Sequence, residues 1–340
     1  MPSGMYADKR SKGATVVKAD HTVSFQCFKK AFLIDENASS LGKIHVLPIG
    51  LHPDYLNNVS NTDIIVGKDH LQSFFKPRNE FAHKGNFGYG GLIAGSKGMM
   101  GAAVLAAKAC LRSGVGKLTC HIPSIGYDIM QVAVPTAMVK VDGKDHIELL
   151  NDFDQYSAIA IGPGIGKYPD HKKTLINLFK HFSKPIVIDA DGLNSLAGEK
   201  ELLESIPPNA VLTPHPKEFE RVFGPVTDDF ERIKIAQQKA NALQIVIVLK
   251  GHHTVIVSPG NHCYYNNTGN VGLAKGGSGD VLTGIILALL CQGYDSTQAA
   301  CFAVWLHGRA ADIAVNDHSY ESLMPEDVIN SIGKVFRELY

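Results

Sequence analysis

The residues best suited to chemistry lie in a glycine-rich stretch in the last quarter of the chain. The string Gly276-Gly277-Ser278-Gly279-Asp280 leads directly into the apolar residues 281–290, and this pattern predicts a helix that begins at the glycines. The first N–H groups of a helix have no intrahelical partner and carry partial positive charge, so glycines there let an anion approach the backbone. We therefore predict an anion hole formed by Gly277, Ser278 and Gly279.

Asp280 follows this anion hole and falls in the first turn of the expected helix. A carboxylate at that place is positioned to accept a proton from a hydroxyl group that attacks a bound phosphorus atom. The alternative is a tight glycine loop in which Asp280 only caps a buried helix. The sequence thus offers a phosphate-binding turn and, directly beside it, Asp280 as the candidate catalytic residue.

Short apolar runs separated by helical sequence indicate the elements that must position these residues. The runs lie at residues 91–95, 117–122, 158–162, 185–189, 210–213 and 245–249. Continuous hydrophobicity marks strands covered on both faces, which predicts an α/β fold with a mostly parallel sheet between two layers of helices. Residues 254–257 and 262–265 predict an antiparallel hairpin at the sheet edge. Longer helices are expected at residues 100–113, 281–292, 297–316 and 325–337.

Ligands of open parallel sheets bind beyond the carboxyl ends of the strands, so the loops there are candidate sites. These loops are rich in glycine and polar residues and comprise residues 95–98, 162–166, 189–194, 213–218 and 250–254. Residues 162–166 lack the spacing of a dinucleotide fingerprint, so we expect them to let a substrate approach the backbone. Asp189 and Asp191 are open to two interpretations, as ligand contacts or as helix caps.

Three ionisable side chains in these loops are candidates for binding. His215 lies between two prolines at a strand end, where we favour ligand contact over a purely structural role. Glu218 is a candidate for organising a hydrated Mg²⁺, and a simple charge in the first turn of a helix is the alternative. Lys250 is a candidate for neutralising nucleotide phosphate, against the alternative of a solvated lysine.

The composition argues against several classes of partner. The chain has 340 residues, and its 33 Lys and Arg balance its 33 Asp and Glu, so no bulk charge recruits nucleic acid or an anionic membrane. The six cysteines include no CxxC pair and lie mostly in apolar runs, which predicts reduced, buried thiols. No apolar run approaches the length of a membrane span and no signal sequence opens the chain. We therefore expect a cytoplasmic protein that acts on small molecules.

The glycine-rich string resembles the anion hole and catalytic aspartate of the ribokinase-like superfamily. Its longer context, residues 267–270 and 274–277, narrows the resemblance to the ADP- or ATP-dependent NAD(P)H-hydrate dehydratases. The resemblance covers roughly residues 70–340, and its further motifs are residues 83–85, 95–96, 101–103, 162–164, 189–194, 212–216 with Glu218, and 249–251 with Thr254. It implies a ribokinase-like three-layer α/β/α sandwich.

The resemblance also implies which residues of this sequence bind the two nucleotides. It implies that the hydrated nicotinamide nucleotide faces Ala102, Gly164, His215 and Asp280. It implies that the adenine nucleotide is held by Lys250, Gly251, His252, His253, Thr254 and Gly279. Mg²⁺ as a cofactor, ADP or ATP as the phosphate donor, and a homo-oligomer of tetramer size or larger follow from the same resemblance.

Residues 1–52 resemble the last third of an NAD(P)H-hydrate epimerase domain, which is fused ahead of the dehydratase in bifunctional nicotinamide nucleotide repair enzymes. The matching motifs are residues 2–5, 17–25, 30–33 and 42–46. In that family an aspartate stands two positions before the Pro-Ser-Gly turn, whereas Met1 directly precedes Pro2 here. We therefore expect no epimerase activity, and a start of the gene product upstream of Met1 stays open. Residues 53–80 are expected to be a connector with one short helix, and residues 81–340 the dehydratase domain.

The resemblance implies a repair reaction, in which the S form of hydrated NADH or NADPH is dehydrated back to the reduced cofactor. ADP or ATP is consumed, and AMP or ADP is released together with phosphate; family analogy with the fused bacterial enzymes favours ADP. One alternative is a kinase of the same superfamily that phosphorylates a hydroxymethylpyrimidine or thiazole alcohol. Another is a non-catalytic nucleotide sensor, against which the intact Asp280 argues, because a pure binder needs no base.

Overall fold

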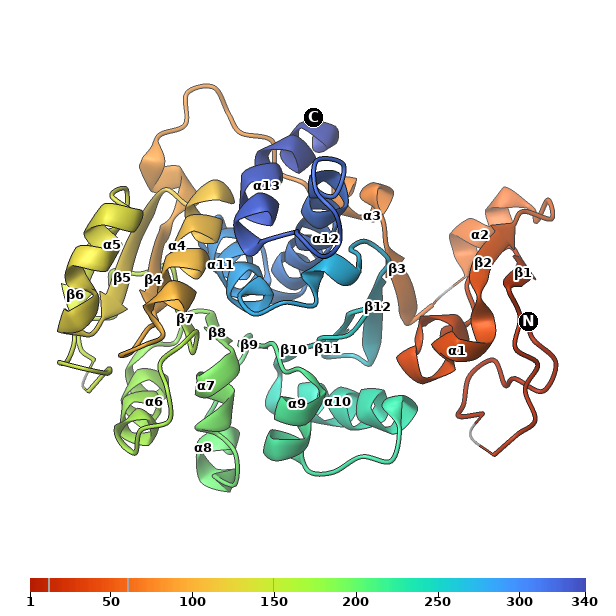
Figure 1. Cartoon of the computed structure of the whole chain (residues 1–340), viewed down its shortest axis with the longest axis horizontal. Coiled ribbons are helices and arrows are strands. Elements are labelled where there is room, and N and C mark those ends of the chain that lie inside the picture. The colour runs from red at the N-terminus through yellow and green to blue at the C-terminus, as the bar shows by residue number, and fades with distance from the viewer. Residues whose placement is uncertain (12, 60, 149) are drawn as a thin grey trace.

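A mostly parallel sheet forms the middle layer of the molecule, and helices cover both of its faces (Figure 1). The computed structural model describes residues 1–11, 13–59, 61–148 and 150–340. Ten described strands form the sheet, in the spatial order β3 (Asp63–Val66), β12 (His262–Asn266), β11 (Val255–Ser258), β10 (Val246–Leu249), β9 (Val211–Leu212), β8 (Ile186–Ile188), β7 (Ala158–Ile161), β4 (Tyr89–Ile93), β5 (Lys117–Ile122) and β6 (Met138–Val141). Of these, β11 runs antiparallel to both of its neighbours. The predicted α/β sandwich is confirmed.

Two layers of helices enclose this sheet. The layer drawn above it in Figure 1 contains α4 (Met100–Arg112), α5 (Tyr127–Ala133), α11 (Ser278–Cys291), α12 (Ser296–Ala314) and α13 (Pro325–Leu339). The layer drawn below it contains α6 (Asp170–His181), α7 (Ala190–Asn194), α8 (Lys200–Glu204), α9 (Pro216–Phe223) and α10 (Asp229–Leu243). No helix in the described part of the chain is long and apolar enough to cross a bilayer.

Alternate residues of the central strands face the two helical layers. In β7, Ala158 and Ala160 belong to the core beneath α11, whereas Ile159 and Ile161 belong to the opposite core. Strand β10 repeats the pattern, with Val246 and Val248 on the α11 side and Ile247 and Leu249 on the other. Because successive side chains point to opposite faces and both faces are buried, each strand is a continuous apolar run.

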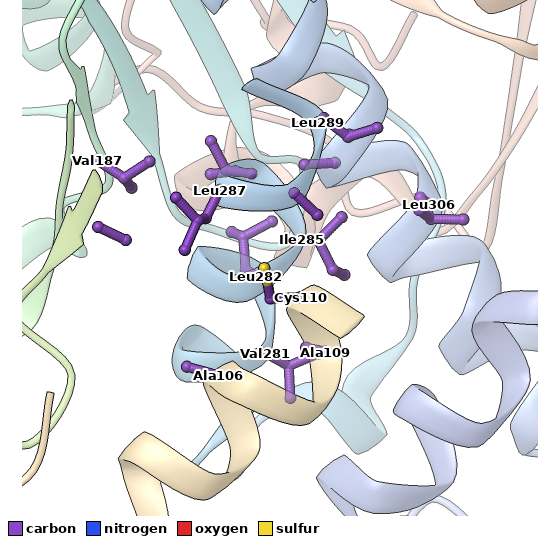
Figure 2. Close-up of a cluster of buried hydrophobic side chains, with 14 of the residues drawn as sticks. Ala106, Ala109, Cys110, Val187, Val281, Leu282, Ile285, Leu287, Leu289 and Leu306 are labelled. Carbon is purple, nitrogen blue, oxygen red and sulfur yellow. The ribbon is translucent and has the colours of Figure 1, made fainter. Parts of the chain in front are cut away.

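Helix α11 is buried along its whole length after the first turn. Every residue from Val281 to Cys291 is buried, as expected for a helix that is apolar on all sides. A Cβ on Gly284 would overlap the carbonyl oxygen of Ala106, so glycine is needed for the close approach of α11 to α4. Figure 2 shows this contact, in which the residues of α4 are Ala106, Ala109 and Cys110 and those of α11 are Val281, Leu282 and Ile285.

The order of the strands reverses between β4 and β7. From β4 the chain adds β5 and β6 on one side, then returns to place β7 to β10 on the other. The carboxyl ends of β4 and β7 therefore form the topological switch point, beyond which open α/β sheets bind ligands. The two following loops are joined there, because Gly95 N–H donates to the Pro163 carbonyl at 2.8 Å and Ser96 Oγ donates to the Gly164 carbonyl at 2.8 Å.

Two sequence expectations about the other end of the sheet are wrong. The hairpin of β11 and β12 is antiparallel as predicted, but β3 pairs with β12 and takes the edge position. Residues 53–80 are therefore more than a connector with one helix, since they supply β3 as well as α2 (Pro53–Asn58) and α3 (Lys68–Gln72). Strand β3 has four residues and pairs with a segment about two hundred residues later, so no local pattern reveals it.

The N-terminal segment packs against the sheet domain. Its parallel strands β1 (His21–Phe25) and β2 (Lys43–Leu47) and the short helix α1 (Ala38–Leu41) enclose a small apolar cluster. Leu33 and Ile34 insert instead into the core of the sheet domain. A salt bridge of 3.1 Å joins Lys30 to Asp63 of β3. The boundary between an epimerase-like part and a dehydratase part stays a proposal.

Substitution Ile34→Ala tests this packing. The Ile34 side chain is 4% exposed within the core of the sheet domain, so the cavity left behind is expected to lower the free energy of unfolding by about 2–5 kcal/mol. Val23→Ala on β1 is the control, because that side chain is 51% exposed and the change should stay within about 0.5 kcal/mol. Equal, small effects of both substitutions in urea denaturation would contradict the packing.

Candidate active site

The N-terminus of α11 lies at the carboxyl edge of the sheet. A Cβ on Gly279 would lie 3.6 Å from Lys250 Nζ and 3.8 Å from Asp189 Oδ2, which follow β10 and β8. Gly277 precedes the helix with a φ of +96°, a conformation that favours glycine. No side chain caps this helix within the described residues. The first N–H groups of α11 therefore point to the place where the sequence predicted an anion hole.

A buried ion pair ties α11 to the sheet. Lys250 Nζ lies 2.9 Å from Asp189 Oδ1, and the Thr283 hydroxyl of α11 donates to Asp189 Oδ2 at 2.7 Å. Burial acts to raise the pKa of Asp189, but the charge of Lys250 and the hydrogen bonds from Lys250 and Thr283 together outweigh it and hold the pKa below its usual range. Asp189 precedes α7 without making a capping hydrogen bond. The helix-cap interpretation of Asp189 is therefore wrong, as is the interpretation of Lys250 as a solvated lysine.

Asp280 occupies the first turn of α11, as predicted. Its carboxylate accepts no hydrogen bond from the residues that the structure describes, in contrast to Asp189. Burial raises the pKa of Asp280 from 3.8 to about 7; the charge of Asp189 adds to this rise, and Lys250 opposes it. A carboxyl group with that pKa exchanges protons readily near neutral pH, which is what a general base requires.

His215 caps helix α9. Its Nδ1 accepts hydrogen bonds from the N–H groups of Lys217 and Glu218 at 3.1 and 3.2 Å, and Glu218 Oε2 accepts from the His215 N–H at 2.9 Å. Since Nδ1 is an acceptor, the ring proton lies on Nε2, which is 3.3 Å from Glu218 Oε1. His215 therefore has the structural role, as a helix cap, that the sequence analysis left open. The side chain is also 42% exposed, so contact with a ligand stays a proposal.

Ala102 and Gly164 lie together beyond the carboxyl ends of β4 and β7. A Cβ on Gly164 would lie 2.9 Å from the Ala102 Cβ and 2.6 Å from the Met99 carbonyl oxygen. Asp191 Oδ2 accepts a hydrogen bond from the Gly166 N–H at 2.9 Å, so Asp191 holds this glycine loop. The structure brings together two residues that the resemblance assigned to one substrate.

Residues 250–254, called the nucleotide loop below, connect two parts of the site. Lys250 points to α11, whereas Gly251, His252 and Thr254 line a cavity of about 340 Å³. The loop is held from inside by Thr254, whose Oγ1 donates to the Gly251 carbonyl at 3.1 Å. It is held from outside by Asp35 of the N-terminal segment, which accepts from the His252 N–H at 3.2 Å.

Sequence reasoning missed two of the residues that organise this site. Thr283 lies three residues after Asp280 and therefore on the same face of α11, so helical spacing would have indicated it. Asp35 lies more than two hundred residues before the loop that it contacts, and no motif marks it.

The donor set is compatible with a cation that arrives with its own ligands. No three His, Cys, Asp or Glu side chains form a metal-binding cluster within the described residues. Asp189, Glu218 and Asp280 all lie close enough to raise the pKa of Lys250, so three carboxylates surround one ammonium group. A Mg²⁺ ion that keeps water and phosphate ligands would balance this negative charge. Both Glu218 oxygens already have protein partners, so contact of Glu218 with such an ion would run through water.

Comparisons with known proteins agree with this geometry. A family model described as NAD(P)H-hydrate dehydratase matches residues 91–334. The chain belongs to this family. An ADP-dependent (S)-NAD(P)H-hydrate dehydratase from Bacillus subtilis is 35% identical over 272 residues, which cover 79% of this chain and 96% of that protein. A bifunctional NAD(P)H-hydrate repair enzyme from Moorella thermoacetica is 33% identical over the whole chain, which spans 66% of the length of that relative.

Solved structures share the fold of this chain. The Bacillus subtilis ADP/ATP-dependent NAD(P)H-hydrate dehydratase, co-crystallized with ATP/Mg²⁺, matches with a TM-score of 0.72 and 34% identity, over 82% of this chain and 99% of that one. A ribokinase-like superfamily protein from Enterococcus faecalis matches with a TM-score of 0.70 at 24% identity, over 83% of this chain and 98% of that one. The predicted ribokinase-like sandwich and the predicted family are confirmed.

The raised pKa of Asp280 predicts a stability effect in this dehydratase-family chain. Because the pKa of Asp280 is about 7 in the folded protein and its ordinary value is 3.8, ionised Asp280 opposes folding, and its cost grows as pH rises from about 4 to 7. Asp280→Asn should therefore stabilise the protein more at pH 8 than at pH 5, as measured by calorimetric melting temperatures. A gain that is equal at both pH values, or a loss at pH 8, would contradict the assigned environment of Asp280.

Proposed function

We propose that this chain uses ADP or ATP to dehydrate the S form of hydrated NADH or NADPH to the reduced cofactor. The observation that carries the proposal is the placement of Asp280, a carboxyl group with a pKa of about 7, beside Lys250 and the uncapped N-terminus of α11. A base, an ammonium group and the N–H groups of a helix N-terminus are the parts that phosphoryl transfer to a hydroxyl group needs. The Bacillus subtilis relative is named for this reaction.

Hydroxide is a poor leaving group, and phosphorylation of the C6 hydroxyl turns it into a good one. Asp280 accepts the proton of the C6 hydroxyl, whose oxygen attacks the terminal phosphorus of the nucleotide, and the bond from that phosphorus to its bridging oxygen breaks to release AMP or ADP. The carbon–oxygen bond of the resulting phosphate ester then breaks, driven by the lone pair of the ring nitrogen. Phosphate leaves with the former hydroxyl oxygen, and loss of a proton from C5 restores the dihydronicotinamide.

The protein supplies charge stabilisation along this path. The anion hole of Gly277, Ser278 and Gly279 offers backbone N–H groups to the transferred phosphoryl group. Lys250 lies beside Gly279 and is kept charged by Asp189 and Glu218, which outweigh the effect of burial and raise its pKa. Mg²⁺ bound with the nucleotide would neutralise further phosphate charge.

The remaining residues divide between two ligands. Ala102 and Gly164 lie beyond the ends of β4 and β7 and would hold the hydrated nicotinamide nucleotide together with His215 at the start of α9. Gly251, His252, His253 and Thr254 would hold the adenine nucleotide along the nucleotide loop. Asp280 lies at the α11 N-terminus beside Lys250, where the two ligands would meet.

Recovery of the absorbance of reduced nicotinamide tests the proposal. The protein and Mg²⁺ are mixed with hydrated NADH and with ADP, with ATP or with neither, and recovery is expected with a nucleotide only. Asp280→Asn should lower the rate by about 10²–10⁴-fold. Asp128→Asn is the control, because this exposed aspartate lies in the first turn of α5. Near-normal turnover of Asp280→Asn would disprove the assignment of the base, and a stable phosphate ester as the product would favour a kinase.

The pH dependence of kcat/KM provides a separate check. Asp280 must be ionised to accept a proton, so kcat/KM should fall tenfold per pH unit below the pKa of about 7. Asp189→Asn removes a negative charge that raises this pKa, so the acid limb should move to lower pH. An acid limb that stays in place in Asp189→Asn would show that another group titrates.

Assembly and location complete the proposal. The family resemblance favours a homo-oligomer of tetramer size or larger in the cytoplasm. Large apolar side chains are exposed among the described residues, including Phe81 at 92%, and burial of such side chains would favour association of subunits. Sedimentation velocity would measure the assembly.

A further inference from the structure

A cavity of about 340 Å³ opens between the nucleotide loop and α12. Gly251, His252 and Thr254 line one side of it. The other lining residues include four aliphatic side chains, Val271, Leu273, Leu282 and Val304. The lining also includes polar side chains, among them Thr268, Asn270 and His307. A cavity of this size with aliphatic walls and polar groups is suited to a flat heteroaromatic ring that forms hydrogen bonds.

One wall of this cavity is fixed to α12 by hydrogen bonds. The Thr268 hydroxyl donates to the Trp305 carbonyl at 3.0 Å, and the Gly269 N–H and the Asn270 side-chain amide donate to Asp312 at 3.0 and 2.9 Å. A Cβ on Gly308 would overlap Thr268, so glycine permits the close approach of loop and helix. The cavity is therefore shaped by the fold itself.

His307 of α12 lines the cavity and has an unpaired ring nitrogen. The residue is 9% exposed, and its buried Nε2 has no hydrogen-bond partner among the described residues. His121, which is also buried, differs: its Nδ1 lies 2.6 Å from Asp142 and its Nε2 lies 2.7 Å from the Tyr156 hydroxyl. A buried polar atom without a partner is costly, so a hydrogen bond from a ligand in the cavity to His307 Nε2 would be favourable.

We propose that His307 hydrogen-bonds the base of the nucleotide and thereby contributes to the choice of an adenine nucleotide. This inference rests on the proposed function, which places the nucleotide phosphates at the N-terminus of α11. A nucleotide that runs from there along the nucleotide loop reaches the cavity with its base, because Gly251 and Thr254 belong to both.

The protonation state of His307 suits this task. Burial lowers the pKa of His307 to about 4, so the ring is neutral near pH 7. A neutral imidazole has one donor and one acceptor nitrogen. The edge of adenine likewise carries an amino donor and ring-nitrogen acceptors, so either tautomer of His307 finds a complementary group there.

Titration calorimetry of the whole chain tests the role of His307. His307→Phe keeps the ring shape but removes both nitrogens, and it is expected to raise the Kd for ATP about tenfold. The Kd for inorganic tripolyphosphate, which has the phosphates without a base, is expected to stay unchanged. The ratio of the tripolyphosphate Kd to the ATP Kd should therefore fall about tenfold in His307→Phe and recover in part in His307→Gln, whose amide again donates and accepts.

His262→Phe is the matched control. The Nδ1 of His262 is also buried without a partner among the described residues, but His262 begins β12 at the end of the strand opposite the nucleotide loop. In His262→Phe, the ratio of the tripolyphosphate Kd to the ATP Kd should equal that of the unchanged protein. An unchanged ratio in His307→Phe, whether both ligands bind as before or both weaken together, overturns the proposal. Failure of the unchanged protein to bind ADP or ATP would contradict the proposed function instead.

Discussion

The burial of α11 is the constraint on which the site depends. The helix is apolar on all sides and packs against α4 without room for a Cβ at Gly284. Its N-terminus is therefore fixed at the carboxyl edge of the sheet, where Thr283 binds Asp189 and Asp189 binds Lys250. The same burial that fixes Asp280 removes water from its carboxylate and raises its pKa to about 7. The burial of α11 thus accounts both for the position of Asp280 and for its raised pKa.

The site concentrates charge that the fold alone does not balance. Three carboxylates surround Lys250, and one of them, Asp280, has no hydrogen-bond donor within the described residues. Such an arrangement opposes folding, because burial and neighbouring negative charge both disfavour an ionised carboxylate. Substrate hydroxyl, nucleotide phosphates and a hydrated cation would supply the missing partners. Functional sites commonly keep such unfavourable groups, and the surrounding core holds them in place.

The sequence predicted those parts of the fold and site that depend on local pattern. The helix start at Ser278, the strands that flank the site and the place of Asp280 in a first turn all follow from glycines and apolar runs that are contiguous in sequence. The pairing of β3 with β12 and the contact of Asp35 with His252 join segments about two hundred residues apart. Such contacts depend on how completed layers pack, so single-sequence patterns do not reveal them.

His215 illustrates a different limit of prediction from sequence, because one side chain can have two roles. The flanking prolines and the strand end suggested ligand contact, and the structure gives the imidazole a capping role at α9. A histidine can cap a helix with one ring edge and present the other to a ligand, so residue type and position leave both roles open. Asp189 is the reverse case, because it holds a capping position while its carboxylate binds Lys250 and Thr283.

The fate of the C6 hydroxyl oxygen tests the central claim most directly. Hydrated NADH labelled with ¹⁸O at this hydroxyl is converted with the nucleotide that supports turnover, and the released phosphate is analysed by mass spectrometry. If Asp280 activates the hydroxyl for attack on phosphorus, the label must appear in the inorganic phosphate. Unlabelled phosphate, with the ¹⁸O recovered in water, would mean that the hydroxyl leaves without being phosphorylated and would contradict the mechanism.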